Sequence, residues 1–464
     1  MSHRFHPTII REYDIRGIVG QTLAVEDSLN LGKAFGTMVA RAGGNRIVVG
    51  YDGRTHSPAF EEALVEGLVS TGATVERVGL GPTPMVYFAA ASRDSDACIM
   101  VTGSHNPADQ NGFKMQMSKR LTGGGPVYGE GIRKLATLAA EGDFVLGTGS
   151  STQVDVQDAY VSRMLQDYKG GKPLNIVWDC GNGAAGEIVE KLVAKLPGTH
   201  TILFGDIDGR FPNHHPDPTE PHNLIDLQKE VAARKADLGI AFDGDADRIG
   251  AIDGQGRIVA GDQLLALYAT EVLKTHPGAT VIADVKASQV LFNHVSVLGG
   301  KPLMWKTGHS LIKVKMAETH APLAGEMSGH IYFADGYYGY DDAIYAAVRL
   351  VSQLARSDQS LGAWLDTLPR TYCTPELRFP VDESLKFKVV EDVKARLKAA
   401  QATVDEIDGV RVSTPDGWWL VRASNTQAAL IVRAESLTPE GLDRLKKAVT
   451  DQLQSCGLNT PLAA

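Results

Sequence analysis

The chain has 464 residues, of which 43% are hydrophobic and 22% are charged, and this ordinary composition excludes a low-complexity or disordered protein. At roughly 100–200 residues per domain, the length predicts three or four domains. The formal net charge of −9 comes from 46 Lys and Arg against 55 Asp and Glu. It argues against a nucleic-acid or membrane-surface role, but it allows an anionic small substrate in a locally positive cleft.

The cysteines and the N-terminal segment indicate the compartment. The four cysteines are far apart and form no C-x-x-C pair, so the sequence predicts neither a disulfide framework nor a zinc site. The first residues lack the apolar core of a signal peptide, and no run of about 18 apolar residues occurs. We therefore expect a cytoplasmic protein without a membrane segment.

A short apolar run followed by a loop rich in Gly, Asp or Ser recurs along the chain. Together with stretches of helical periodicity, this alternation predicts α/β units with parallel or mixed sheets. In open α/β sheets, ligands bind beyond the carboxyl ends of the strands, although Gly and Asp also end strands simply by forming turns. The runs and their loops are 47–49 and 50–54, 98–101 and 102–107, 176–178 and 179–183, 238–242 and 243–245, and 281–283 and 284–286.

Three breaks divide this pattern. Residues 147–152 are small and polar, as linkers are. Residues 253–256, Asp-Gly-Gln-Gly, form either a second break or the tip of a hairpin. After residues 368–370 the sequence predicts strands and two helices, without the strand-loop-helix pattern. The predicted domains are therefore 1–150, 151–256, 257–368 and 369–464.

The first candidate loop is Thr102-Gly103-Ser104-His105-Asn106-Pro107, which follows an apolar strand. An exposed serine hydroxyl on such a loop can carry a phosphate covalently. The loop is not the G-x-S-x-G elbow of esterases, and the adjacent His105 does not by itself indicate a catalytic triad. Taken alone, the segment is equally typical of an ordinary turn.

The second candidate loop is Asp243-Gly244-Asp245-Ala246-Asp247-Arg248. Its alternating carboxylates can point at one centre and offer the oxygen ligands that Mg²⁺ prefers. An EF-hand needs Gly at the sixth loop position and Glu at the twelfth, but these positions hold Arg248 and Gly254. A solvated acidic turn is the plain alternative. The preceding apolar run and the cation of Arg248 favour a metal beside an anionic ligand.

Several motifs, in this order, resemble those of the α-D-phosphohexomutases, specifically the bacterial phosphomannomutase/phosphoglucomutase family. The resemblance covers essentially the whole chain, and it implies four domains around a central cleft. Three would be related α/β domains with mixed sheets, and the last a smaller C-terminal α+β domain. The motifs are Tyr-Asp-Ile-Arg-Gly at 13–17, the serine loop at 102–107, Asp-Cys-Gly-Asn-Gly at 179–183, the acidic loop at 243–248, Gly-Glu-Met-Ser-Gly-His at 325–330 and Arg-Ala-Ser-Asn-Thr at 422–426.

The resemblance also implies an isomerase that moves phosphate between C1 and C6 of glucose or mannose. Ser104 would carry the phosphate, and a hexose 1,6-bisphosphate would be the intermediate. Mg²⁺ would be held by Asp243, Asp245, Asp247 and an oxygen on Ser104. The remaining residues of the implied catalytic set are Lys114, His330, Arg248, Tyr13, Arg16 and His105.

The implied substrate contacts divide into sugar and phosphate contacts. Glu326 and Ser328 would bind hydroxyls that glucose and mannose share, so that C2, where the sugars differ, is left unread. Arg422 would clamp the phosphate that does not react. Taken alone, 422–426 is also typical of a surface turn, and a lone histidine such as His309 of a structural residue. The further implied contacts are Lys286, Gly308, His309, Gly329, His330, Ser424, Asn425, Thr426 and Arg433.

Three other functions remain open. A phosphoglucosamine mutase would have the same scaffold, although Met327 stands where those enzymes are expected to have Gln. A magnesium-dependent sugar phosphatase would release phosphate in place of isomerising, and a silent binding protein would not need a metal beside a nucleophile. The expected partners are small sugar phosphates, with no nucleic acid and no membrane, and the expected state is a monomer or weak dimer.

Overall fold

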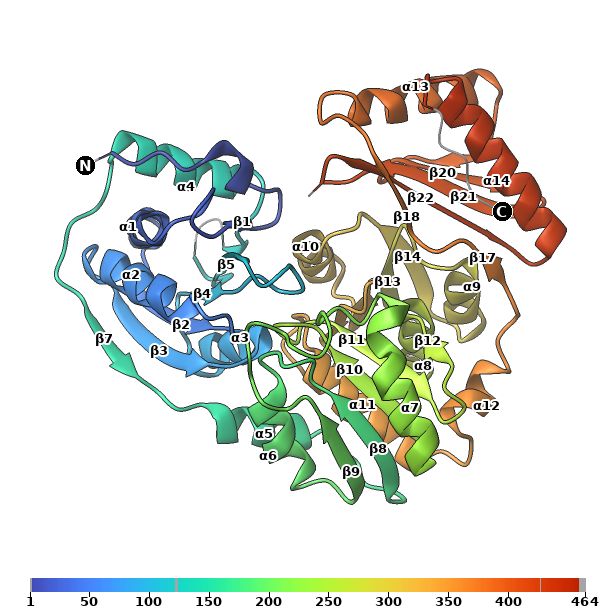
Figure 1. The fold of residues 1–464 in the computed structure, drawn as a ribbon, viewed down its shortest axis with the longest axis horizontal. Helices are drawn as coiled ribbons and strands as arrows, with labels where there is room; N and C mark the ends of the chain where they lie inside the picture. The colour runs from blue at the N-terminus through green and yellow to red at the C-terminus, as the bar shows by residue number, and fades with distance from the viewer. Residues whose placement is uncertain (1, 122–123, 426, 459–464) are drawn as a thin grey trace.

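The computed structural model describes residues 2–121, 124–425 and 427–458. Four sheets follow one another along the chain, and each is covered by helices (Figure 1). None of the helices in this described part has both the length and the apolarity that crossing a bilayer requires.

The first sheet has the order β1-β5-β4-β2-β3-β7, with β6 paired to β5. Strands β2, β3, β4 and β7 run parallel, whereas β1 and β5 are antiparallel to their neighbours. The strands are β1 Ile15–Ile18, β2 Arg46–Tyr51, β3 Thr74–Leu80, β4 Ala97–Val101, β5 Gln110–Met117, β6 Gly125–Pro126 and β7 Ser150–Gln153. The helices are the 3-10 turn η1 Pro7–Ile9, α1 Val25–Arg41, α2 Ser57–Val69, α3 Thr83–Ser92 and α4 Glu130–Glu141.

The second sheet has the order β12-β11-β10-β8-β9. Its centre is parallel, and β10, β11 and β12 form an antiparallel meander. The strands are β8 Leu174–Asp179, β9 Gly198–Leu203, β10 Leu238–Phe242, β11 Ile249–Asp253 and β12 Ile258–Val259. The helices are α5 Gln157–Leu165, α6 Gly186–Val193, the 3-10 turn η2 Pro221–Leu224 and α7 Ile225–Arg234.

The third sheet has the order β14-β13-β15-β16, with only the β15–β16 pair antiparallel. The strands are β13 Thr280–Asp284, β14 Lys301–Trp305, β15 Leu323–Gly325 and β16 Ile331–Phe333. The helices are α8 Gly261–Thr275, α9 Gln289–Val297, α10 His309–Thr319, α11 Ala343–Ala355 and α12 Leu361–Leu365.

The fourth sheet is antiparallel, with the order β17-β22-β21-β20-β19 and β18 paired to β22. It carries two long helices, as the change of sequence style after 368–370 predicts. The strands are β17 Tyr372–Cys373, β18 Leu377–Pro380, β19 Val404–Asp405, β20 Val410–Thr414, β21 Gly417–Ala423 and β22 Ala429–Ser436. The helices are α13 Lys386–Ala399 and α14 Pro439–Gln454.

Two of the sequence breaks lie inside secondary structure. Residue 150, the last of the first predicted domain, begins β7, which pairs in register with β3 through Ser150 and Thr74. Residues 253–256 form a hairpin tip, because β11 continues into β12 with Ala251 opposite Val259. The domain limits given above therefore remain a proposal.

The hydrophobic core shows which parts of the chain form one body. One buried cluster runs from Val48 to Leu361 and includes side chains from the first three sheets. The last sheet packs its own core, from Val381 to Leu453, against α13 and α14. Among the residues that the structure describes, the two meet in a small apolar cluster of Val285, Trp418 and Leu420, with Met304 and Ile407 packed against it. The C-terminal part is therefore built as a separate unit that meets the rest of the chain mainly through polar side chains.

Candidate active site

The serine loop begins where the fully buried strand β4 ends. Ser104 is 2% exposed and has a left-handed backbone conformation, with φ of 50°, which is uncommon outside glycine. Its hydroxyl donates a 3.0 Å hydrogen bond to Asp243 Oδ2, and His105 Nδ1 lies 3.1 Å from Ser104 Oγ. The serine loop and the acidic loop, which come from different sheets, therefore meet at Ser104.

The acidic loop is the tight connection between β10 and β11, whose last pair is Phe242 and Ile249. Asp243, Asp245 and Asp247 are fully buried, and one carboxylate oxygen from each lies within 4.8 Å of the others. Burial, followed by the charges of Asp245 and Asp247, raises the pKa of Asp243 well above its usual range. Within the described part of the chain, Asp245 Oδ1 is buried without a hydrogen-bond partner.

These observations fit a divalent cation bound among the three aspartates. Buried carboxylates in this proximity repel one another, and a cation relieves that repulsion. Hard divalent ions take carboxylate oxygens as ligands, and an unpartnered buried oxygen is a ready donor. The acidic loop therefore forms a group that can hold a metal ion.

Lys114, on β5, reaches into the acidic loop. Its Nζ lies 2.6 Å from Asp245 Oδ2 and forms a second ion pair with Asp247 Oδ2. Burial alone lowers the pKa of the Lys114 amine, but the charges of Asp245 and Asp247 raise it above its ordinary value. The ammonium therefore remains charged and offsets part of the negative charge of the loop.

His330, the last residue of the predicted sugar loop at 325–330, reaches the acidic loop. Its Nε2 is 3.3 Å from Asp247 Oδ1, and its Nδ1 is 3.2 Å from Glu326 Oε2. Arg248 Nε lies 3.3 Å from His330 Nε2. Burial lowers the pKa of the His330 imidazole, but the Asp247 charge and hydrogen bonds to Asp247 and Glu326 raise it to about 9. His330 is therefore a buried imidazole that retains a proton at neutral pH.

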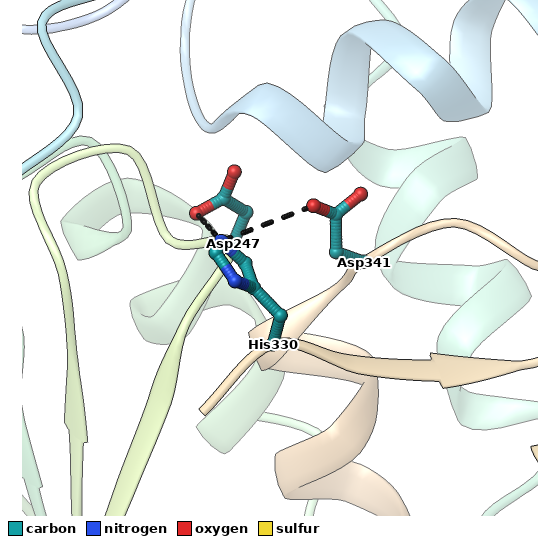
Figure 2. Close-up of side chains that lie close together, drawn as sticks. All are labelled: Asp247, His330 and Asp341. Atoms are coloured by element: carbon teal, nitrogen blue, oxygen red, sulfur yellow. Dashed lines mark ion pairs between the residues drawn. The ribbon is translucent and has the colours of Figure 1, made fainter. Parts of the chain in front are cut away.

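Asp341 also faces His330, as Figure 2 shows, with its Oδ2 4.0 Å from His330 Nε2. The other oxygen of Asp341 lies 3.0 Å from Lys313 Nζ, and His309 Nδ1 is 3.8 Å from Oδ2. Sequence reasoning missed both Asp341 and Lys313. The Asp-Asp pair at 341–342, directly before the strongly apolar helix α11, is a local signal for Asp341, whereas Lys313 has none.

The sugar loop is the tip of the hairpin formed by β15 and β16. Glu326 accepts a 2.8 Å hydrogen bond from Gly308 N and one of 2.9 Å from the Tyr332 hydroxyl. Burial raises the pKa of Glu326, but hydrogen bonding and charge from His330 dominate and lower it to about 2. Gly329 has φ of 91°, and its carbonyl accepts from Ile249 N at 3.0 Å, which ties the loop to β11. Ser328 Oγ lies 3.2 Å from His330 Nδ1.

The predicted phosphate-binding residues lie at the junction with the C-terminal unit. Lys286 Nζ donates to Glu376 Oε2 at 2.8 Å, and Arg422 Nη2 lies 3.0 Å from Asp408 Oδ2. Glu376 and Asp408 are partners that sequence reasoning missed. Arg433 Nη1 donates to the Lys286 carbonyl at 2.5 Å, and Ser424 Oγ accepts from Gln427 N at 3.1 Å. Thr426, predicted for the same set, lies outside the described residues.

Tyr13 and Arg16, from the N-terminal motif, contact different parts of the site. The Tyr13 hydroxyl donates to the Thr307 carbonyl at 2.9 Å and accepts from Asn425 Nδ2 at 2.6 Å. Arg16 Nη1 donates to Asn106 Oδ1 of the serine loop at 2.8 Å. The N-terminal segment therefore contacts both the serine loop and the C-terminal unit.

The predicted residues thus form one connected network. From Ser104 it passes through the acidic loop to His330 and Glu326, and from there to Gly308. A Cβ on Gly308 would lie 2.6 Å from Tyr13 Cζ, so this glycine packs directly against the residue that contacts Asn425. The arrangement joins a serine hydroxyl, an acidic loop that can hold a metal ion, a protonated imidazole and a set of cations.

Comparison with known proteins shows the family to which the chain belongs. The chain is 42% identical over 455 residues to the phosphomannomutase/phosphoglucomutase of Pseudomonas aeruginosa, covering 98% of this chain and 97% of that protein. The chain belongs to the phosphoglucomutase/phosphomannomutase family. The predicted resemblance is therefore confirmed.

All four domain models of the phosphoglucomutase/phosphomannomutase family match the chain in order. They are alpha/beta/alpha domain I at 7–144, domain II at 158–256, domain III at 260–372 and the C-terminal domain at 376–452. The predicted fold class, with three related α/β mixed-sheet domains and a smaller C-terminal α+β domain, is confirmed.

Two further relatives in this family are similar over nearly the whole chain. A phosphoglucomutase from Neisseria gonorrhoeae is 42% identical over 451 residues, covering 96% of this chain and 97% of that protein. The crystal structure of a phosphoglucomutase/phosphomannomutase family protein from Burkholderia thailandensis is 43% identical, with a TM-score of 0.92, and covers 99% of this chain and all of that one.

Proposed function

We propose that this protein is a phosphohexomutase that interconverts the 1-phosphates and 6-phosphates of glucose and mannose. Ser104 carries the transferred phosphate, and a hexose 1,6-bisphosphate is the intermediate. The observation that carries the proposal is the 3.0 Å hydrogen bond between the Ser104 hydroxyl and Asp243, within a buried loop of three aspartates. A protein that only binds sugar would not need a nucleophilic serine beside one sheet to contact a cation-binding loop beside another.

The proposed metal is Mg²⁺, held by Asp243, Asp245, Asp247 and an oxygen on Ser104. When bound, such an ion supplies positive charge that offsets the phosphate and polarises phosphorus for attack. Lys114 and Arg248 place further positive charge beside the loop. Phosphoryl transfer depends largely on positioning and on such charges.

Proton transfer must accompany each phosphoryl step. As a sugar hydroxyl attacks phosphoserine 104, the hydroxyl loses a proton and the P–Oγ bond breaks, so Ser104 Oγ gains one. When Ser104 instead attacks a phosphate of the bisphosphate, its hydroxyl loses a proton. His105 Nδ1 is 3.1 Å from Ser104 Oγ, and burial lowers the pKa of His105 well below its usual range, so the neutral ring can accept that proton and return it to Oγ when the P–Oγ bond next breaks. On the sugar side, Lys114 is held as a cation, and we assign the proton transfer to His330. Its protonated imidazole would give a proton to the sugar oxygen that leaves when Ser104 attacks, and would take one from the sugar hydroxyl in the opposite step.

The bisphosphate must turn over so that its second phosphate returns to Ser104. One clamp must then hold whichever phosphate is not reacting. We propose that Arg422, Ser424, Asn425 and Thr426 form this clamp, together with Lys286 and Arg433, because guanidinium and hydroxyl donors suit a phosphate. Asp408 and Glu376 already pair with Arg422 and Lys286, and a bound phosphate would share these cations with them.

The sugar itself is proposed to bind Glu326 and Ser328, next to Gly308, His309 and Gly329. A carboxylate has about four acceptor positions, so Glu326 can bind sugar hydroxyls in addition to its internal donors. Contacts to hydroxyls that the two sugars share do not distinguish the configuration at C2. The relatives' names support this breadth only in part, because the Pseudomonas protein is named for both sugars and the Neisseria protein for glucose alone.

The proposal extends to the setting of the enzyme. We propose that it works in the cytoplasm, as a monomer or weak dimer, on small sugar phosphates and without nucleic acid or membrane. Gel filtration with light scattering would test the oligomeric state.

The deciding experiment incubates the purified protein, Mg²⁺ and a trace of glucose 1,6-bisphosphate with three substrates in turn: glucose 1-phosphate, mannose 1-phosphate and glucosamine 1-phosphate. Phosphorus NMR should show the 6-phosphates of glucose and mannose without free phosphate. Release of inorganic phosphate would indicate a phosphatase, and turnover restricted to glucosamine 1-phosphate would indicate the phosphoglucosamine mutase alternative. Intact mass should show one added phosphate that peptide mapping places on Ser104.

A further inference from the structure

The segment Tyr51-Asp52-Gly53-Arg54, at the end of β2, is a polar loop that the proposed mechanism does not use. It lies beside the serine loop because β2 and β4 are neighbours in the first sheet (Figure 1). Both charged side chains are buried, Asp52 with 2% of its side chain exposed and Arg54 with none. Burying charged groups is unfavourable unless they are paired and hydrogen-bonded, so this pair needs a structural or functional reason.

The hydrogen bonds of Arg54 give that reason. Arg54 Nη2 donates to the carbonyls of Ser104 at 2.7 Å and Asn106 at 2.6 Å. Its Nη1 donates to the carbonyls of Pro107 at 2.5 Å and Gln110 at 2.9 Å. A guanidinium has five N–H donors, and the fifth, on Nε, reaches Asp52 Oδ2 at 3.2 Å. Four of the five donors therefore hold the backbone of the serine loop and the residues that follow it.

Asp52 holds the beginning of the same loop. Its Oδ2 accepts from Thr102 Oγ1 at 2.7 Å and from Gly103 N at 3.1 Å. Thr102 Oγ1 in turn accepts from Ser104 N at 2.7 Å. Asp52 itself is held through Oδ1, which accepts from Ser57 Oγ at 2.7 Å. The two side chains together fix the loop from residue 102 to residue 110.

The conformation of Ser104 explains why the serine loop needs the frame that Arg54 and Asp52 form around it. A serine with φ of 50° is in the left-handed region, which non-glycine residues adopt only when their surroundings over-determine it. The neighbouring Gly103 allows the frame to approach, since a Cβ there would lie 2.4 Å from Arg54 Cζ. Arg54 binds the carbonyl of Ser104, while the hydroxyl points to Asp243.

We infer that Arg54 and Asp52 are positioning residues that hold Ser104 Oγ against Asp243 and thereby set the rate of phosphoryl transfer to and from this serine. The inference deepens the proposed function and rests on it. All five N–H donors of Arg54 bind protein acceptors, so Arg54 acts through the loop and not on the substrate. Its loss should therefore slow the chemical step while leaving the sugar and phosphate contacts in place.

The test compares Arg54→Lys with Arg349→Lys. Both arginines are buried, but Arg349, on α11, pairs with Asp335 away from the serine loop. Lysine keeps the charge but has three donors in place of five. A misplaced reacting group costs roughly 10²-fold in rate. We expect R54K to lower kcat by roughly 10²-fold with KM for glucose 1-phosphate within about 3-fold. R349K should change neither.

A second readout isolates the half-reaction. The dephosphorylated proteins are mixed with glucose 1,6-bisphosphate and Mg²⁺, and intact mass follows the gain of one phosphate. R54K should gain phosphate slowly, and guanidinium chloride at low millimolar concentration should accelerate Arg54→Ala, whose cavity admits that ion, but not Arg349→Ala. If R54K does not fold, Thr102→Val removes the link from Asp52 to Ser104 N at similar volume and should slow the same half-reaction.

The outcomes separate the two proposals. An active wild-type protein with R54K and T102V both at wild-type kcat would overturn the positioning role and leave the proposed function intact. A rise in KM with unchanged kcat would also overturn it, because the defect would then lie in substrate binding. A wild-type protein that exchanges no phosphate would overturn the proposed function, and the inference with it.

Discussion

The Ser104 hydroxyl donates to Asp243 Oδ2 across 139 positions of sequence. The serine follows a strand of the first sheet, and the aspartate follows a strand of the second. Their contact means that the packing of the first two domains, and not either domain alone, assembles the proposed reacting centre. Ser104 is therefore the single residue at which the proposed phosphoryl transfer can be tested.

Ser104→Ala should abolish exchange between glucose 1-phosphate and glucose 6-phosphate. The variant lacks the oxygen that carries the phosphate, so turnover should fall to the background of the assay. Intact mass should show no added phosphate after incubation with glucose 1,6-bisphosphate. Ser455→Ala, at an exposed hydroxyl near the C-terminus, is the matched control and should behave as wild type. Measurable turnover in Ser104→Ala would contradict a serine carrier.

Lys114→Met should make the stability of the protein depend more strongly on Mg²⁺. Removing one partner of a buried ion pair typically costs about 3–5 kcal/mol, because it leaves buried charges uncompensated. Here Asp245 and Asp247 would lose their internal cation, and a bound divalent ion would replace part of it.

Thermal melts in a chelator and in excess Mg²⁺ measure this dependence. Mg²⁺ should raise Tm more in Lys114→Met than in the wild-type protein. Lys386→Met provides the comparison, because Lys386 is a buried lysine of the C-terminal domain whose Nζ donates to the Ser424 carbonyl. It should lose stability without any added response to Mg²⁺. An equal Mg²⁺ response in all three proteins would refute the coupling.

Arg422→Ala should weaken the use of glucose and mannose phosphates alike. A hydrogen bond to a charged group contributes about 1.5–3 kcal/mol, so kcat/KM should fall roughly 10- to 100-fold for both. Arg444→Ala, which removes an exposed arginine paired with Asp416, should have little effect. A loss confined to one sugar would show that Arg422 reads the sugar and not the phosphate.

Tyr13→Phe should loosen the contact between the N-terminal segment and the C-terminal domain. The variant loses the hydroxyl that donates to Thr307 and accepts from Asn425, but it keeps the ring beside Gly308. Two hydrogen bonds of ordinary strength contribute about 1–3 kcal/mol, so KM should rise roughly 5-fold or more. Hydrogen exchange should become faster in residues 422–425. Unchanged exchange there would argue that the contact does not hold the domain.

The buried carboxylate of Asp342 should give the stability a defined pH dependence. Burial is the largest cause that raises its pKa to about 6 from an ordinary 3.8, against hydrogen bonds from Tyr345 N, Tyr337 and Tyr160. Because the folded chain then binds more protons than the unfolded chain, the free energy of unfolding falls as pH rises from about 4 to about 6. The contribution is about 3 kcal/mol.

Asp342→Asn removes this titration. Chemical denaturation at a series of pH values should show the wild-type protein losing stability relative to Asp342→Asn across that window. Asp358→Asn, at an exposed carboxylate, should run parallel to wild type. Parallel curves for wild type and Asp342→Asn would mean that the Asp342 pKa is not raised.

Local sequence signals explain much of the agreement between the fold predicted from the sequence and the fold of the structure. An apolar run that ends in Thr-Gly-Ser or Asp-Gly-Asp predicts both the strand and the loop that ends it, and the order of the motifs predicts the fold. The connection from 147 to 152 gave no such signal. Residues 150–153 are exposed and polar, so nothing in the pattern showed that they would pair with β3 as β7.

The partners of the site residues could not be predicted for a different reason. Asp408 and Glu376 are ordinary acidic residues in sequence. The fold of the C-terminal domain brings Asp408 to Arg422, and the packing of that domain against the third brings Glu376 to Lys286. Asp341 belongs to the site because it faces Lys313 and His330, which lie on other elements. Arg54 is similar, since its acceptors are backbone carbonyls, which carry no sequence signature.

The contact between Tyr13 and Asn425 spans 412 positions, and it has a consequence for biosynthesis. By the time a ribosome has made residue 256, the nascent chain already contains the serine and all three aspartates. The arginine and asparagine of the proposed clamp, Arg422 and Asn425, emerge more than a third of the chain later. A product terminated at that point therefore retains Ser104 and its acidic loop but lacks the residues proposed to hold the phosphate that does not react. The contact with Tyr13 forms only after Asn425 has been made.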